Sequence, residues 1–226
     1  FQVIGLIAAL LSLVPLVAAD YWWVRVFDFP HIQLTAFTLL AIILYFFTFK
    51  PKWIQDYLYI TILLGCFAFQ FSKLVNYTPF VSFGIEDSSA NVSDENKLLV
   101  YTANVLQKNK EGAKLFEEIR ELKPDVIIFT ETNTRWMNYI RQQIGNDYDY
   151  RVEEPLDNTY GMILYSKWPL QDSQVKYMVD KDIPSIHSKV EMPNGKLFQL
   201  YAVHPTPPMP QHNPSSRDRD AELMKI

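Results

Sequence analysis

The sequence predicts a helical membrane anchor followed by an α/β domain, and two observations support this prediction. Apolar residues make up 49% of the chain, but they gather near its start in three runs without a charged side chain. From about Lys97 onward, strand-like segments alternate with amphipathic helices. The single cysteine, Cys66, lies in an apolar run, which excludes a disulfide framework and a cysteine metal site.

The three uncharged runs cover residues 1–19, 32–49 and 57–72. Each approaches the roughly 20 residues that a helix needs to cross a hydrocarbon core of about 30 Å. We therefore expect three transmembrane helices within residues 1–75. Three buried helices of a soluble protein are the alternative, which the close succession of the runs disfavours.

The charges between the runs predict an orientation. Lys50 and Lys52 lie between the second and third runs, whereas Asp20, Arg25 and Asp28 lie between the first and second. Loops rich in positive charge stay on the cytoplasmic side. We expect a multi-pass protein of the cell membrane, in contact with the lipid bilayer, whose later domain is extracytoplasmic. Residues 76–96 are acidic and lack periodicity, which is typical of a linker.

Residues 97–226 are expected to form an α/β domain. The run Val126–Phe129 is typical of a strand buried on both faces, and Asn194 with Gly195 predicts a hairpin turn. We expect helices over 109–123 and 134–144, and a last helix capped by Ser215 or Ser216. Strands are expected over residues 98–105, 125–130, 148–152, 160–165, 175–178, 186–190 and 197–203.

Three polar residues stand at the ends of predicted strands. Asn104, Glu131 and His204 occupy these positions, and ligands gather at the carboxyl ends of strands in α/β sheets. A carboxylate suits a hard divalent cation, an amide orients a phosphate, and an imidazole donates a proton. Taken singly, each has a plainer explanation: a turn former, a helix cap and a surface histidine. Their common placement favours one shared cleft.

The segments around these residues resemble the endonuclease/exonuclease/phosphatase family, and the resemblance covers most of residues 97–226. The loop after His204 and the three preceding apolar runs resemble the membrane-bound bacterial branch of that family. The segments that carry the resemblance are Thr102-Ala103-Asn104-Val105, Lys123-Pro124-Asp125-Val126-Ile127-Ile128-Phe129-Thr130-Glu131-Thr132, Gly161-Met162-Ile163-Leu164-Tyr165-Ser166-Lys167-Trp168-Pro169-Leu170 and Val203-His204-Pro205-Thr206-Pro207-Pro208.

The resemblance implies a four-layered, deoxyribonuclease-like α/β sandwich. It implies that Glu131 ligates Mg²⁺ or Mn²⁺, with Asn104 near the metal and the phosphate. His204 would contact the phosphate and act as an acid. The implied activity is a metal-dependent phosphoesterase that hydrolyses a phosphodiester or a phosphomonoester by in-line attack of water.

Two departures from the family pattern qualify this expectation. Asn133 stands where many relatives carry a basic residue, and the later Asp-x-Asn and Asp-His motifs are not within residues 97–226. We therefore expect this segment to be the N-terminal part of the domain and the chain to be inactive by itself. Two alternatives stay open: a catalytically inactive, membrane-tethered binding or sensing module, and a structural membrane protein.

Charge limits the substrate. Residues 97–226 contain 17 Lys and Arg against 18 Asp and Glu, and no basic run. Binding of a nucleic-acid backbone usually requires a positive surface. A lipid headgroup or a small diester is favoured as the phosphate-ester substrate, nucleic acid stays open, and no protein partner is evident.

Several other residues are given structural explanations. Gly161 is expected to allow close packing of a core strand. His187 and His212 are expected on the surface. The alternating charges from Arg217 to Asp220 are typical of a solvated helix face, with phosphate contact by Arg217 as the weaker alternative.

Overall fold

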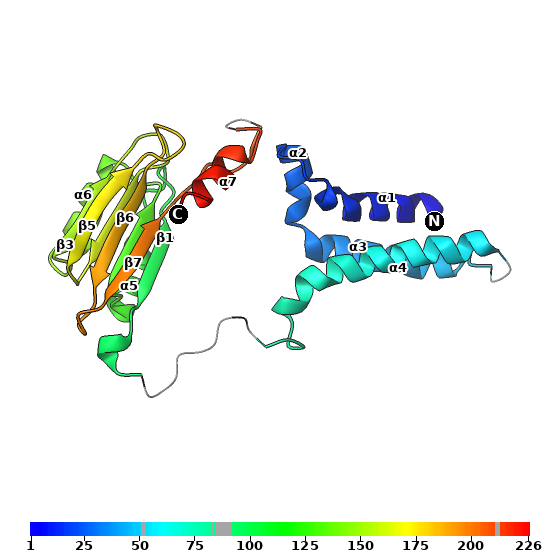
Figure 1. The fold of residues 1–226 in the computed structure, drawn as a ribbon, viewed down its shortest axis with the longest axis horizontal. Helices are drawn as coiled ribbons and strands as arrows, with labels where there is room; N and C mark the ends of the chain where they lie inside the picture. The colour runs from blue at the N-terminus through cyan, green and yellow to red at the C-terminus, as the bar shows by residue number, and fades with distance from the viewer. Residues whose placement is uncertain (51–52, 83, 85–91, 211–212) are drawn as a thin grey trace. The chain divides into compact units, whose positions relative to one another are not determined.

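A computed structural model describes residues 1–50, 53–82, 84, 92–210 and 213–226. The chain divides into two compact units (Figure 1). We call residues 1–87 with 207–217 the helical unit, and residues 88–206 with 218–226 the sandwich unit. Lys52 and His212, which entered the predictions above, lie outside the described residues.

The helical unit is built around three packed helices (Figure 1). Residues of all three helices contribute to one apolar cluster that includes Ala9, Ile42 and Leu63. The elements are α1 (Gln2–Leu13), η1 (Val14–Leu16), α2 (Trp22–Arg25), η2 (Val26–Asp28), α3 (His31–Phe46), α4 (Ile54–Leu74) and η3 (Val75–Tyr77).

One stretch of this unit is long and apolar enough to cross a membrane, where three were expected. It runs over Ile54–Tyr77 and has a mean hydropathy of 1.7. The first expected span is shorter because α1 gives way at Val14 to a 3₁₀ turn that contains Pro15. The second qualifies only if α3 is joined to the preceding Trp22–Asp28 segment, and a bend of 77° separates the two. By length and composition, the described residues therefore offer one candidate span, or two if the bent pair counts as one.

Polar side chains, unusually, lie between the helices of this unit. Ser12 and Thr38 are fully buried and their hydroxyls are 3.3 Å apart. Gln70, also fully buried, donates to Ser12 O at 3.2 Å, and its Oε1 lies 2.7 Å from His31 Nδ1. Small and polar residues at the contacts, with large apolar residues outside, are typical of helices packed in lipid.

The sandwich unit contains two sheets. The four-stranded sheet has the order β1-β2-β4-β3, and the three-stranded sheet has the order β5-β6-β7. Among the seven strands that the structure describes, β1 and β2 are the one parallel pair. The elements are η4 (Asp94–Asn96), β1 (Val100–Asn104), α5 (Ala113–Leu122), β2 (Val126–Thr130), α6 (Thr134–Ile144), β3 (Tyr150–Glu154), β4 (Met162–Ser166), β5 (Leu170–Lys176), β6 (Ser185–Glu191), β7 (Leu197–Ala202) and, shared with the helical unit at Arg217, α7 (Arg217–Leu223).

Two apolar cores hold this unit together. In the first, Phe116 of α5 and Trp136 of α6 pack on one face of the four-stranded sheet, against Phe129 and Tyr165. In the second, Ile128 and Leu164 on the opposite face meet residues of β6 and β7. The described residues thus form three of the four expected layers. These are a layer of helices (α5 and α6), the four-stranded sheet and the three-stranded sheet. β2 is buried on both faces, as predicted.

Three local predictions were wrong. α5 begins at Ala113 rather than Asn109, because the Asn109 side chain bonds the backbone of Glu111 and holds a turn. β5 begins at Leu170 rather than 175, through a polar, exposed stretch with a register shift. His187 is only 8% exposed, since the Tyr201 ring packs on it and Ser185 Oγ lies 3.0 Å from its Nε2.

Candidate active site

The carboxyl ends of β1 and β2 lie at the same rim of the sheet, because these strands are parallel neighbours. Asn104 is the last residue of β1, and Glu131 follows β2 directly. Asn104 Nδ2 donates a hydrogen bond to Glu131 Oε1 at 2.6 Å. The amide and the carboxylate predicted for one cleft are therefore in direct contact.

His204 approaches the same carboxylate from the other sheet, two residues after the end of β7. Its Nε2 lies 3.8 Å from Glu131 Oε1. Burial lowers the pKa of His204, and the nearby Glu131 carboxylate offsets only part of that effect. The imidazole is thus mainly neutral at pH 7, and its contact with Glu131 is a close approach between a neutral ring and a carboxylate. All three predicted site residues meet around one oxygen atom.

The backbone that presents Glu131 is unusual. Its φ of +60° is uncommon for a residue with a side chain, and such conformations persist only where the surroundings hold them. Thr132 N–H donates to Gly161 O at 3.0 Å, and Leu156 N–H donates to Thr132 O at 3.0 Å. A Cβ at Gly161 would stand 1.8 Å from Thr132 O, so only glycine permits this approach. The expected close-packing role of Gly161 is confirmed.

The amide of Asn104 is held in one orientation by its own chain. Its Oδ1 accepts a hydrogen bond from Leu106 N–H at 3.0 Å, while its Nδ2 faces Glu131. Leu106 adopts a φ of +52° and its side chain is exposed. The amide therefore has no freedom to flip without losing one of its two bonds.

Two residues that the sequence did not single out support this rim. Gln107 accepts from Thr159 N–H at 2.7 Å and donates to Asp157 O at 3.0 Å. Arg135 Nη2 donates to the carbonyls of Gln107 and Asn109, at 3.0 and 2.5 Å. The loop after β1 is thereby fastened to the loop before β4 and to the start of α6. No spacing in the sequence signals contacts over such separations.

Asn133, which departs from the family pattern, is the N-cap of α6. Its Oδ1 accepts from Trp136 N–H at 3.1 Å. Asparagine is among the favoured residues at this position. The residue is thus used to start a helix, and an asparagine placed three residues before Trp136 is a signal that sequence reasoning could have used.

The donor set at the rim fits a hard divalent cation. Among the described residues, no cluster of three or more His, Cys, Asp or Glu could hold a metal alone. Mg²⁺ is usually held through one or two carboxylates, with waters and substrate phosphates completing its shell. Glu131 supplies a carboxylate of that kind, beside a neutral imidazole, whereas the Asn104 amide turns its nitrogen to Glu131 and its oxygen to Leu106 N–H.

The fold and the rim together define an α/β sandwich with a carboxylate, an amide and an imidazole gathered at strand ends. The model of the endonuclease/exonuclease/phosphatase family matches residues 101–226, which is more than half of the chain. This chain belongs to the endonuclease/exonuclease/phosphatase family. No match was found among the curated proteins.

The solved structures that match this chain have low sequence identity to it. TDP2 of D. rerio, crystallised with a single-strand DNA product, has 16% identity and a TM-score of 0.48, covering 57% of this chain and 52% of its own. An endonuclease/exonuclease/phosphatase of Beutenbergia cavernae DSM 12333 has 14% identity and a TM-score of 0.46, covering 57% and 42%. TDP2 of C. elegans has 13% identity and a TM-score of 0.46, covering 75% and 51%. The matches therefore span about half the length of these proteins.

Proposed function

We propose that this chain is the anchored part of a divalent-metal-dependent phosphoesterase that hydrolyses a phosphodiester or phosphomonoester by in-line attack of water. One observation carries the proposal: Glu131 Oε1 is 2.6 Å from Asn104 Nδ2 and 3.8 Å from His204 Nε2. Membership of a family of endonucleases, exonucleases and phosphatases supports the reaction class.

In this proposal Glu131 and Asn104 hold Mg²⁺ or Mn²⁺. The cation, when bound, neutralises negative charge that develops on the phosphate. Asn104 keeps the Glu131 carboxylate in one orientation through its Nδ2 hydrogen bond. The φ of +60° at Glu131 aims that carboxylate over the rim of the sheet, in advance of substrate.

His204 has a separate role in the proposal. Because its imidazole is mainly neutral, it accepts a hydrogen bond from a protonated phosphate oxygen or donates one to a charged oxygen. Tyr160 limits its rotation, since the two rings lie 5.7 Å apart at an angle of 47°. The residues that would activate the attacking water are not assigned among those that the structure describes.

We also propose that the helical unit anchors the enzyme in the cell membrane, with the sandwich unit extracytoplasmic. The candidate span over Ile54–Tyr77 and the polar contacts between helices support the anchor. The proposed orientation rests on the charged connections between the apolar runs. A phosphate ester near the bilayer, such as a lipid headgroup or a small diester, fits this arrangement, and nucleic acid stays an outcome of the test.

The proposal is tested on the complete protein with Mg²⁺ or Mn²⁺. Hydrolysis of bis(p-nitrophenyl) phosphate, of phospholipid vesicles and of single-stranded DNA is compared between wild type and Glu131→Gln. We expect the variant to lose at least about 10²-fold in kcat/KM, because the carboxylate is the main anionic ligand at the rim. Equal activity of the two proteins would overturn the assignment.

A matched control and a binding measurement complete the test. Glu118→Gln changes an exposed glutamate of α5 that bonds Tyr101, away from the rim, and should leave hydrolysis unchanged. Mn²⁺ binding to this chain, followed by electron paramagnetic resonance, should weaken in Glu131→Gln only. Metal binding without hydrolysis by the complete protein would support the inactive binding module instead.

A further inference from the structure

Residues 213–217 belong to the helical unit although they follow the last strand of the sandwich unit. Only Pro205 and Thr206 separate His204 from the point where the chain enters the helical unit. The chain leaves that unit again after Arg217, within α7. We call residues 213–217 the docking segment, and residues 20–25 the anchor surface on which it lies.

Backbone pairing joins the docking segment to the anchor surface. Trp22 N–H donates to Pro214 O at 2.8 Å, and Ser216 N–H donates to Asp20 O at 2.8 Å. Tyr21 and Ser215 lie between these two bonds as an antiparallel bridge. Two reciprocal hydrogen bonds across one residue pair form the smallest unit of an antiparallel sheet. The two segments therefore pair in the same way as neighbouring strands of an antiparallel sheet.

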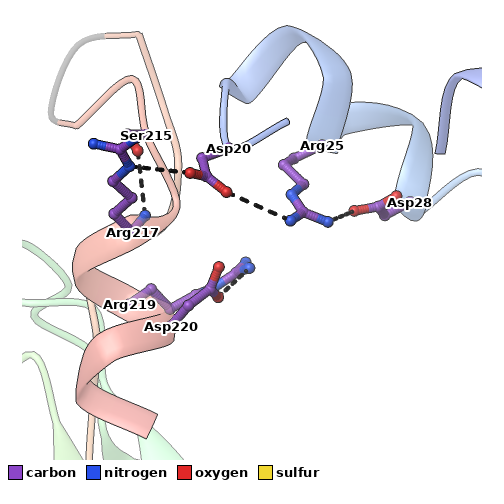
Figure 2. Close-up of polar contacts among 7 residues, drawn as sticks. All are labelled: Asp20, Arg25, Asp28, Ser215, Arg217, Arg219 and Asp220. Atoms are coloured by element: carbon purple, nitrogen blue, oxygen red, sulfur yellow. Dashed lines mark hydrogen bonds and ion pairs between the residues drawn. The ribbon is translucent and has the colours of Figure 1, made fainter. Parts of the chain in front are cut away.

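A row of alternating charges runs beside this bridge. Arg217 Nε donates to Asp20 Oδ2 at 3.1 Å, and Arg25 Nη2 lies 3.8 Å from Asp20 Oδ1. Arg25 Nη1 also donates to Asp28 Oδ2 at 3.4 Å. Figure 2 shows Arg217 and Arg25 on either side of Asp20, with Asp28 beyond Arg25. Arg219 is turned to Asp220 and takes no part in this row.

The charge row gives a role to Asp20, Arg25 and Arg217, which the proposed active site does not use. Asp20 carries two cationic neighbours, and one of them, Arg217, comes from a position almost two hundred residues later in the chain. The Arg217 side chain is 81% exposed, so its ion pair is weak, and the backbone bridge carries most of the contact. Arg217 adds one exposed ion pair to a contact that main-chain bonds hold.

We propose that the docking segment is fastened to the anchor surface in the working enzyme, so that the anchor holds the chain that leaves the strand-end histidine. The helical unit then does more than attach the protein to a membrane. It also holds residues 213–217, which begin nine positions after His204 in the chain. The consequence for catalysis rests on the proposed function, whereas the docking itself does not.

Disulfide trapping tests the docking directly. The chain has one cysteine, Cys66, so Cys66→Ala gives a clean background. In it, Tyr21→Cys with Ser215→Cys places two thiols across an antiparallel bridge, where Cα atoms are about 4.5–5.5 Å apart, within disulfide range. The protein is studied in nanodiscs that hold one copy each. We expect mild oxidation to yield an intramolecular crosslink, seen as a linked peptide pair by mass spectrometry.

The control pair is Tyr21→Cys with Phe47→Cys, because Phe47 is exposed in the same unit and follows the far end of α3. It should stay reduced under the same conditions. If the bridge pair crosslinks no faster than this control, while its far-ultraviolet circular dichroism matches wild type, the docking is refuted. A second pair, Asp20→Cys with Ser216→Cys, is used if the first variant does not fold. If this pair also crosslinks no faster than the control pair, the docking is refuted.

The charge row gives a graded test. In the Tyr21→Cys/Ser215→Cys background, Arg217→Gln should slow crosslinking roughly two- to fivefold, as expected for loss of one exposed ion pair. Arg217→Lys should restore much of the rate, and Arg219→Gln should leave it unchanged. Equal slowing by the Arg217 and Arg219 substitutions would contradict a specific role for Arg217.

Activity of the crosslinked protein tests whether the docked state is the working state. The complete protein with the bridge pair is assayed oxidised and reduced, on the substrate that shows dependence on Glu131. Retained activity in the oxidised form supports the proposal, and recovery of activity only on reduction overturns it. Absence of hydrolysis in every form would refute the proposed function while the crosslink still reports docking.

Discussion

The two units of this chain place apolar and polar side chains in opposite ways. In the sandwich unit, Phe129 and Trp136 are buried, with 0% and 1% exposure. In the helical unit, Ile62 and Leu10 are 55% and 66% exposed, whereas Ser12 and Gln70 are fully buried. One chain therefore contains an aqueous fold and a fold whose outer surface suits lipid.

This contrast separates the unit that carries the candidate site from the unit that carries the candidate membrane span. A rim of hydrogen-bonded polar groups needs a rigid frame, and the aromatic core of the sandwich unit provides it behind Glu131. The helical unit buries its polar groups in pairs between helices, so they satisfy one another. Such pairs hold the helices together.

The largest expected effect tests the aqueous core. Phe129→Ala removes a fully buried ring that packs on Phe116 of α5 and lies two residues before Glu131. We expect a loss of about 3–5 kcal/mol in the free energy of unfolding of the sandwich unit, from lost burial and the cavity left behind. Urea denaturation followed by tryptophan fluorescence measures it.

A matched substitution in the other unit controls this result. Phe47 is 79% exposed in the helical unit, so Phe47→Ala should leave the urea midpoint of the sandwich unit unchanged. Equal destabilisation by the two substitutions would mean that the units do not unfold as separate cores.

The second effect tests whether the exposed apolar surface of α4 faces lipid. Ile62 lies near the middle of α4, and Ile62→Asp places a charge there. On a soluble helix an exposed aspartate costs little, but at the centre of a membrane span it costs about 2.5–3.5 kcal/mol. We expect the variant to be extracted from membranes by alkaline carbonate, whereas Ile62→Leu stays in the membrane pellet. Retention of Ile62→Asp would contradict the lipid-facing assignment of α4.

The sequence anticipated elements whose signal is local. Val126–Phe129 is a continuous apolar run, and β2 is buried on both faces of the sheet as that run requires. Gly195 adopts a φ of +80° in the turn between β6 and β7, which the Asn-Gly pair predicts. α6 has its expected bounds, because an N-cap residue and a glycine mark its two ends.

Features that depend on distant neighbours were missed. β5 runs from Leu170 through the polar stretch Gln171–Gln174, where pairing with β6 overrides a sequence without apolar alternation. His187 is polar and lacks a ligand partner in sequence, yet the ring of Tyr201 on β7 covers it. The length of the first apolar run suggested a span, but Pro15 changes the helix there.

The candidate site shows the same division. Strand-end position was enough to name Asn104, Glu131 and His204, because topology brings strand ends together. The support of the rim by Gln107 and Arg135 was not predictable, since it joins loops of irregular backbone through side-chain bonds to carbonyl and amide groups. Their roles as ligands and acids stay predictions.

The smallest expected effect concerns a charged pair at the edge of the aqueous core. Glu153 accepts hydrogen bonds from Arg141 and from Tyr165, the latter at 2.8 Å, and its side chain is 10% exposed. Burial alone would raise the pKa of Glu153, but the hydrogen bonds and the Arg141 charge outweigh burial and hold the pKa below its usual 4.5. The charged form is therefore favoured in the folded state.

A lowered pKa in the folded protein fixes the sign of the pH dependence. The stabilisation from Glu153 is fully present above pH 4.5 and is lost as the pH falls below that value, through the folded-state pKa. We expect Glu153→Gln to lower the free energy of unfolding by about 1–2 kcal/mol at pH 7, with the difference from wild type shrinking below pH 4.5. Glu154→Gln is the neighbouring control, because Glu154 bonds Tyr177 instead and no Arg141 contact is lost. A difference that grows as the pH falls would show that Arg141 does not stabilise the charged carboxylate, and that this edge of the sandwich is held by apolar packing alone.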